Sequence, residues 1–294
     1  LAEPPRAAVR GIDRTTPHPG ARVPSLDQAP ASTAPSSTTS NSLERNTMSS
    51  FKALTASLAR ASLRDPATLL FFFIFLPTLL VVLANAARCC PGADGHGIVN
   101  SIGPNVMGFG VALIGMFAGM TNMAGWREKD AIRILRCAPM SVPAIRASAL
   151  TVALLFSVIL SVIIMMVGVV PVVGMSLTPW APLVMVPVFL GTLVFYSLGV
   201  LVGAVAPTAP AGFPVMVGVT TTMSIASGAV VPVEVLPQWV QALSGFTPMT
   251  YLLEGLRWPL TGVNSPDEAL TGWAVTAAVG LVFFWATSGL MRWR

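Results

Sequence analysis

Long apolar runs without a charged side chain dominate the chain from residue 68 onward, with polar segments between them. Six such runs lie near 68–87, 102–125, 148–173, 181–206, 212–231 and 272–291. A helix needs about 20 apolar residues to cross the hydrocarbon core of a bilayer. Runs of this length without Asp, Glu, Lys, Arg or His are more typical of membrane spans than of buried core helices. The pattern therefore predicts an all-α membrane protein with six transmembrane helices.

An amphipathic segment precedes the first run. Apolar side chains recur near helical spacing from 51 to 64, and the other faces carry Lys52, Arg60 and Arg64. A basic amphipathic helix beside an apolar run is expected to lie flat at the membrane surface. We therefore predict an N-terminal interfacial helix over this segment.

The segment 232–271, between the fifth and sixth runs, has apolar patterns of its own. Apolar residues recur at helical spacing over 236–243, and a second stripe after Pro248 consists of Met249, Leu252, Leu253 and Leu256. Each piece is too short to span a bilayer. We expect short external helices that dip into the outer interface or re-enter the membrane beside the bundle.

Residues 1–47 differ from the rest, because they are rich in Pro, Ser, Thr, Ala and Arg. Such a segment buries too little apolar surface to offset its conformational entropy, so we predict a disordered tail. It has no apolar stretch of the kind found in a secretory signal. Met48 stands where the ordered pattern begins. The segment is therefore interpreted either as a mis-assigned start or as a cytosolic tail, with one membrane domain over 48–294.

Composition supports lipid as the solvent for much of the surface. Of the 294 residues, 54% are hydrophobic and 10% are charged, with a mean hydropathy of +0.74. An ordinary soluble domain has about 25% charged residues. This composition excludes disordered, collagen-like and coiled-coil proteins, and it disfavours a soluble enzyme.

The net charge of +5 suggests nucleic acid as a partner until the charges are placed along the chain. Of the 17 Lys and Arg residues, eight lie in 1–67, five in 126–147 and two in 292–294. Basic residues concentrate in cytoplasmic segments of membrane proteins. Both termini and the 126–147 loop are therefore predicted to face the cytoplasm, and no nucleic-acid partner is needed to explain the charge.

The 126–147 loop has two interpretations. Ala131, Ile132 and Leu135 share one helical face, Arg133 and Arg136 lie on others, and Pro139 ends the helix. The segment is either a solvated charged loop that supplies the orientation signal, or a short helix on which a cytosolic partner docks. The pattern alone leaves both open.

Residues for catalysis are missing from the sequence. No phosphate-binding loop is present, because neither Lys52 nor Lys129 follows a glycine. His18 and His96 fall in expected loops without the spacing of a zinc site. The runs contain no base for an intramembrane serine protease and no ionisable group of the kind ion-coupled transporters use. We expect no nucleotide, metal or catalytic site on this chain.

Small and sulfur-containing residues give weaker signals. The GxxxG patterns from Gly115 to Gly119 and from Gly199 to Gly203 permit close helix approach, but they assign no particular interface. The cysteines are Cys89 and Cys90 after the first run, and Cys137 in the cytoplasmic loop. We interpret them as free thiols, or as a bridge between two chains through the first pair.

Several short motifs occur in a fixed order around the six runs. They are Leu63-Arg64-Asp65-Pro66, Phe75-Leu76-Pro77, Trp126-Arg127-Glu128-Lys129, Ala138-Pro139-Met140-Ser141, Ala206-Pro207-Thr208, Ser227-Gly228, Pro232, Leu236-Pro237-x-Trp239, and Pro248-Met249-Thr250-Tyr251 with Arg257. In this order they resemble the permease subunit of ABC-2 type ATP-binding-cassette exporters, from about Phe51 to the C-terminus. The sequence departs from the family at Asp130, where Gly is frequent, at Ala138, where Thr is, and at Thr247, where Asn is.

The resemblance implies a complex of two permeases, identical or homologous, with two cytosolic ABC ATPase subunits that bind ATP and Mg. It implies no cofactor on this chain, and a bacterial plasma membrane as its location. Its coupling segment would use Arg127, Glu128, Lys129, Ile132, Arg133, Leu135, Arg136 and Pro139. Its interfacial helix would use Lys52, Arg60 and Arg64, and its external element Pro237, Trp239, Pro248, Tyr251 and Arg257.

The apolar, Met- and Phe-rich runs favour a lipophilic substrate, because such side chains repack around varied shapes. Our hypothesis is an exporter of a drug, an antibiotic or a lipid-like compound. Export of a polysaccharide or lipid-linked glycan is the alternative within the class. A secondary transporter or a self-contained membrane enzyme is the alternative outside it.

Overall fold

The structure is a computed structural model that describes residues 55–60, 69–88, 95–128, 142–229 and 237–290. Within these ranges the regular structure is helical throughout, which confirms the predicted all-α class. Residues 55–60 form a short helix. The further elements are η1 (Phe71–Phe75), α3 (Leu76–Arg88), α4 (Gly95–Glu128), α6 (Val142–Val169), η2 (Ala181–Val184), α7 (Met185–Val205), α8 (Ala209–Ala226), α9 (Gln238–Ser244), α10 (Pro248–Thr261) and α11 (Pro266–Leu290).

Five helices are long and apolar enough to cross a membrane. They cover Val99–Arg127, Ile145–Val169, Ala181–Val205, Ala209–Ala226 and Pro266–Thr287. The first predicted run forms a shorter apolar helix over Phe71–Ala87, which begins as the π-helix η1. All six predicted runs are therefore helical over most of their length, while a count of six complete spans stays a prediction.

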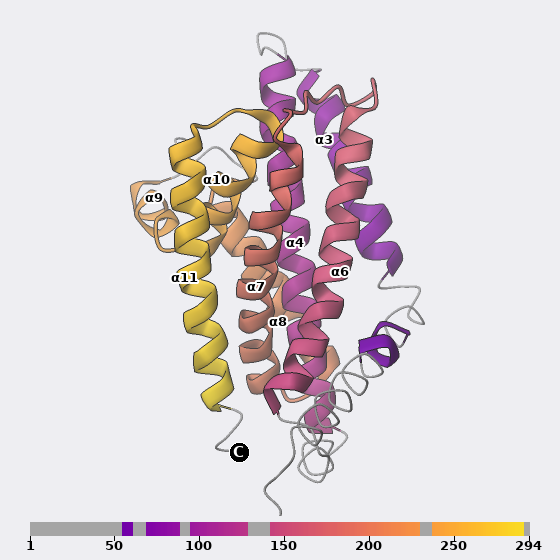
Figure 1. Cartoon of the computed structure of the whole chain (residues 1–294), viewed down its shortest axis with the longest axis vertical. Helices are drawn as coiled ribbons and strands as arrows, with labels where there is room; N and C mark the ends of the chain where they lie inside the picture. Colours follow the sequence, from indigo (N-terminus) through magenta and orange to yellow (C-terminus); the bar gives the residue numbers. More distant parts are fainter. Residues whose placement is uncertain (1–54, 61–68, 89–94, 129–141, 230–236, 291–294) are drawn as a thin grey trace, which may run out of the picture. The chain divides into compact units, whose positions relative to one another are not determined.

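Helix α4 lies at the centre of the packing. It contacts α3, α6, α7, α8 and α10 (Figure 1), and its contact with α7 is the most extensive in the described residues. In the most apolar 18-residue stretch of the span Val99–Arg127, 72% of the residues are buried. The corresponding share is 22% in α8 and in α11. The outer faces of α8 and α11 are apolar, as a surface solvated by lipid requires.

The two GxxxG patterns face each other in the α4–α7 contact. A Cβ atom at Gly119 would lie 2.1 Å from the carbonyl oxygen of Tyr196, and one at Gly199 would lie 2.1 Å from that of Met116. At Gly203 the nearest atom would be the carbonyl oxygen of Met120, at 2.6 Å. Backbone meets backbone at these positions, so any side chain would push the helices apart.

The third predicted run, 148–173, forms α6, and the structure differs from the predicted boundaries at both ends. Residues 170–173 were expected inside a span, but they form a turn after α6. The amide of Gly174, which has a φ of 68°, donates to the carbonyl of Val170 there. A backbone with positive φ favours glycine, so Gly174 suits the turn that follows the end of α6 at Val169.

At its other end α6 begins at Val142, inside the predicted 126–147 loop. This start places Arg146 in the helix, with 1% of its surface exposed. Arg146 therefore lies within the candidate span Ile145–Val169 rather than in a solvated loop, so the prediction of spans free of charge is wrong at this position.

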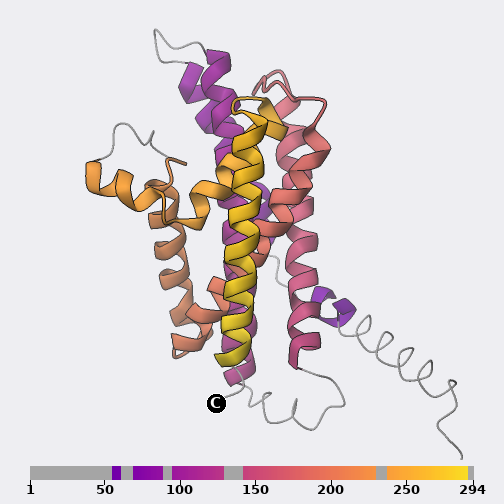
Figure 2. The same cartoon turned by 60° about the vertical axis from the view of Figure 1, so that its left-hand side comes forward.

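The predicted external helices have contrasting surroundings. The apolar stripe of α10, from Met249 to Leu256, is buried against the bundle, where α10 contacts α4, α7 and α11. None of the α9 residues is buried, and the Trp239 side chain is 68% exposed. Figure 2 shows α9 beyond the end of α8, while α10 returns toward α11. Re-entry of these helices into the membrane stays a prediction.

Candidate functional site

The end of the bundle at which α4 ends and α6 begins is called the basal end here (Figure 1). Arg127 ties two helices together at this end. Its Nη1 donates hydrogen bonds to the carbonyl oxygens of Gly203 (3.3 Å), Ala204 (2.7 Å) and Ala206 (3.1 Å). α7 ends at Val205, so these carbonyls lack partners within the helix, and a cation there is favourable. Arg127 thus joins the end of α4 to the end of α7.

The structure describes only part of the expected coupling segment. Arg127 and Glu128 form the end of α4. The remaining expected coupling residues lie outside the described residues: Lys129, Ile132, Arg133, Leu135, Arg136 and Pro139. Of the interfacial residues, Arg60 is exposed in the short helix 55–60, while Lys52 and Arg64 lie outside the described ranges. Contact of these residues with an ATPase stays a prediction.

Arg146 is a buried charged group that the sequence reasoning missed. Its Nη2 donates a hydrogen bond of 2.6 Å to the Thr287 hydroxyl on α11. Its guanidinium carbon lies 4.8 Å from the centre of the Phe284 ring, in a cation–π contact. The pair joins α6 to α11 near the basal end. An available signal was the apolar pattern of α6, which already begins at Val142.

Two of the expected external residues, Arg257 and Tyr251, form hydrogen bonds that join helices. Arg257 donates to the Asn105 side-chain oxygen at 3.3 Å, and the Asn105 amide donates to the Ala229 carbonyl at 3.0 Å. These bonds join α10, α4 and the end of the α8 segment. Tyr251 donates to the Gly245 carbonyl at 2.8 Å and so joins α10 to the end of α9.

Pro237, Pro248 and Trp239 belong to helix starts and to the exposed surface. Pro237 is the N-cap of α9, and Pro248 is the first residue of α10, where proline fits the helix geometry. Trp239 contributes an exposed indole on α9. Burial raises the pKa of the nearby Glu254 carboxyl, and the charge of Arg257 opposes that shift.

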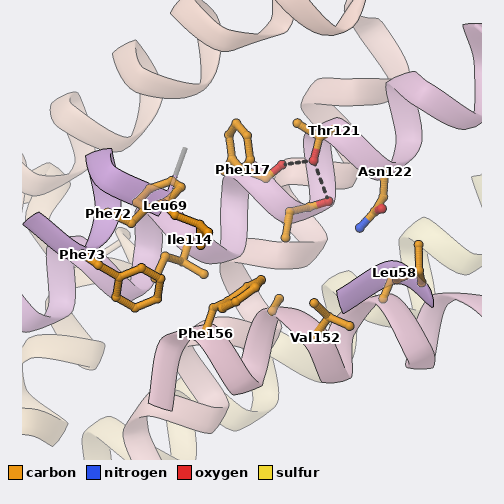
Figure 3. A pocket seen from close by; sticks show the side chains of 13 residues that line it. Leu58, Leu69, Phe72, Phe73, Ile114, Phe117, Thr121, Asn122, Val152 and Phe156 are labelled. Atoms are coloured by element: carbon orange, nitrogen blue, oxygen red, sulfur yellow. Dashed lines mark hydrogen bonds between the residues drawn. The ribbon is translucent and has the colours of Figure 1, made fainter. Parts of the chain in front are cut away.

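A cavity of about 270 Å³ lies between four segments: the helix 55–60, η1 with the residues just before it, α4 and α6. Its lining is mainly apolar and consists of Leu58, Leu69, Phe72, Phe73, Ile114, Phe117, Ala118, Thr121, Asn122, Ala149, Val152, Ala153 and Phe156. Figure 3 shows Phe72 and Phe73 at one end of this space, and Leu58 and Asn122 at the other. We call it the four-segment pocket.

Aromatic contacts shape the pocket wall. Phe72 and Phe117 meet edge to face, with ring centres 5.5 Å apart, and Phe73 and Phe156 do so at 6.1 Å. The π-helix η1 supplies Phe72 and Phe73, and single π-helical turns are frequent at functional sites. No group of His, Cys, Asp or Glu residues in the described ranges could hold a metal ion.

The fold and its apolar helices define a multi-pass membrane protein. A family model described as ABC-2 type transporter matches residues 49–261, which is more than half of the chain. The chain therefore belongs to the ABC-2 type transporter family, in which the membrane permease works with an ABC ATPase on a separate chain. The match extends through α10 and stops before α11. A search of curated protein sequences finds no match to the chain.

Proposed function

We propose that this chain is the permease subunit of an exporter that moves a lipophilic drug, antibiotic or lipid-like compound out of a bacterial cell. It lies in the plasma membrane with the basal end and both termini in the cytoplasm. Two ATPase subunits bind ATP and Mg, and a second permease, identical or homologous, completes the complex. The chain itself binds neither nucleotide nor metal.

The lining of the four-segment pocket is the observation that supports a lipophilic substrate. Thr121 and Asn122 are the polar side chains in its lining, and the Thr121 hydroxyl already donates to the Phe117 carbonyl at 2.8 Å. A glycan carries many hydroxyl groups, and burying them without partners is costly. An apolar wall with one free amide therefore favours a lipophilic compound over a polysaccharide.

Helix α4 connects the expected ATPase-docking segment to the external helices, so it can transmit a movement of the ATPase. At 34 residues it is about 50 Å long. Its end leads into the expected docking segment and is bonded to α7 through Arg127, while its first half contacts α10 at Asn105 and Gly108. The close α4–α7 contact favours movement of the two helices as one unit. A displacement at the ATPase would then reach the external helices directly.

Reconstitution of the permease with its ABC ATPase partner tests this proposal. Inside-out proteoliposomes should accumulate lipophilic dyes and antibiotics when ATP is present. An ATPase subunit unable to hydrolyse ATP is the control and should abolish accumulation. Transport of an oligosaccharide without any lipophilic compound, or failure of the two proteins to co-purify, would contradict the proposal.

A further inference from the structure

We propose that the four-segment pocket binds the apolar part of a small neutral amphiphile, whose polar group bonds the Asn122 amide. Through Leu58, the bound ligand then changes the activity of the ATPase. The inference rests on the proposed function and names the regulation of that exporter. A bound ligand would stimulate ATP hydrolysis because it bridges the helix 55–60 and the end of α4.

The size of the pocket limits the ligand. Its volume of about 270 Å³ is just below the usual range of about 300–1,000 Å³ for ligand sites. It therefore holds one ring system or a short alkyl segment rather than a whole phospholipid. An empty apolar cavity leaves its walls without contacts on one side, so an apolar occupant is favoured.

The polar end sets the chemistry of the ligand's head group. Asn122 is half-buried, and its side chain forms no hydrogen bond within the described residues. A carboxamide offers two donors and one acceptor. It suits a carbonyl, hydroxyl or amide group next to the apolar body, whereas a charged group would have no counter-charge in the lining.

Leu58 connects the pocket to the basal end. It lines the pocket and also packs against the cluster that contains Met123, Tyr196 and Val200. Asn122 is five positions before Arg127 on the same helix, and Arg127 holds the end of α7. A ligand between Leu58 and Asn122 therefore touches both the interfacial helix and α4, whose end leads into the expected coupling segment.

Phe117 extends the contact to a further helix. Its ring meets Phe72 at 5.5 Å, and it also meets Phe213 on α8 at 6.4 Å between ring centres. Filling the pocket fixes the Phe72 and Phe117 rings in this arrangement. The occupied pocket thus contacts η1, α4 and α6 directly, and α8 through one aromatic ring.

Two photoreactive probes with the same diazirine group show whether the pocket binds a small amphiphile or a membrane phospholipid. One is a dodecanol that bears the diazirine, and the other is a phosphatidylcholine that bears it in an acyl chain. The permease–ATPase complex in nanodiscs is labelled with each, and the modified residues are located by mass spectrometry. The alcohol should label the lining residues, and Nile red should displace it. Labelling by the lipid without the alcohol would mean a structural lipid and would overturn the inference.

Three variants test the coupling with Nile red as the ligand and ATPase activity as the readout. Ala153→Phe should block labelling and stimulation, because Ala153 lines the pocket and is 1% exposed. Asn122→Leu keeps the volume and should weaken the apparent affinity about fivefold to tenfold through one lost hydrogen bond. Leu58→Ala should retain labelling and lose most of the stimulation.

Leu155→Phe is the matched control for Ala153→Phe, because Leu155 is on the same helix and 51% exposed. It should label and respond like the unchanged complex. If Ala153→Phe or Leu58→Ala still responds to Nile red while transport continues, this inference fails alone. If the unchanged complex shows neither ATPase association nor transport, the proposed function fails first.

Discussion

Arg127 and Arg146 belong to the same basic cluster of the sequence, yet their side chains have different surroundings. Arg127 bonds the last carbonyls of α7, whereas Arg146 is 1% exposed and bonds Thr287 beside Phe284. Burying a guanidinium is costly unless hydrogen bonds or an aromatic face replace water. α11 supplies both to Arg146. A count of charges per segment contains no information on side-chain direction, so the α6–α11 contact could not be predicted from it.

Replacing Arg127 separates an internal role from a docking role. In Arg127→Ala the carbonyls of Gly203, Ala204 and Ala206 lose a charged donor. We expect a loss of about 1 kcal/mol at the end of α7. Hydrogen exchange should become faster in the peptide that contains these residues, and the melting temperature should fall by a few degrees.

Arg60→Ala is the control, because Arg60 is exposed at the end of the helix 55–60. It should leave exchange in α7 unchanged. If Arg127→Ala also leaves α7 unchanged and reduces only co-purification with the ATPase, the internal role of Arg127 is contradicted and docking is its function.

At the scale of elements, the sequence predicts helices better than it predicts their partners. The apolar stripe of α10 was visible from Met249 to Leu256, and it is the buried face of that helix. The two GxxxG patterns were also visible, but the pattern is the same whichever helix it faces. Only the structure shows that Gly119 and Gly199 face each other's helix. Ends of helices depended on local backbone, such as the positive φ of Gly262 at the C-cap of α10.

Gly199→Ala tests whether this contact sets the distance between α4 and α7. The added Cβ would lie 2.1 Å from the Met116 carbonyl oxygen and 2.8 Å from its carbon, and backbone atoms cannot turn away. The helices must separate, which we expect to cost about 1–3 kcal/mol. The unfolding temperature of the purified complex should fall, and coupled ATPase activity should fall with it.

Gly218→Ala provides the comparison, because a Cβ at that position of α8 meets nothing within 4 Å. This change should be neutral or slightly stabilising, since alanine favours a helix more than glycine does. Equal loss of stability in both variants would show that close backbone approach is not the cause.

At the scale of the whole molecule, composition predicted a lipid-exposed surface, and the helices α8 and α11 supply it. Only 22% of the most apolar window in each is buried, and Trp285 on α11 is 75% exposed. The four-segment pocket could not be predicted in the same way. Its walls come from segments far apart in sequence, and its Phe and Ala residues look like ordinary span residues until the helices are packed. The sequence indicated a lipophilic substrate through composition alone.

The orientation of the molecule is a prediction from the charge distribution, and it can be tested with single cysteines. In a background with Cys89, Cys90 and Cys137 replaced by serine, Val172→Cys and Val263→Cys are placed in turns expected outside the cell. Both side chains are about half exposed, at 52% and 48%. A maleimide that does not cross membranes should label both on intact cells, because basic segments stay in the cytoplasm.

Pro207→Cys and Ser57→Cys report on the opposite side, since both positions are exposed near the basal end. They should react only after the cells are permeabilised. Labelling of residue 207 but not 172 on intact cells would show that the topology is the reverse of the predicted one. Labelling of residue 57 from outside, with the other three sites as expected, would mean that the short helix Phe71–Ala87 does not cross the membrane. The protein would then have five spans, and the interfacial helix could not meet a cytosolic ATPase.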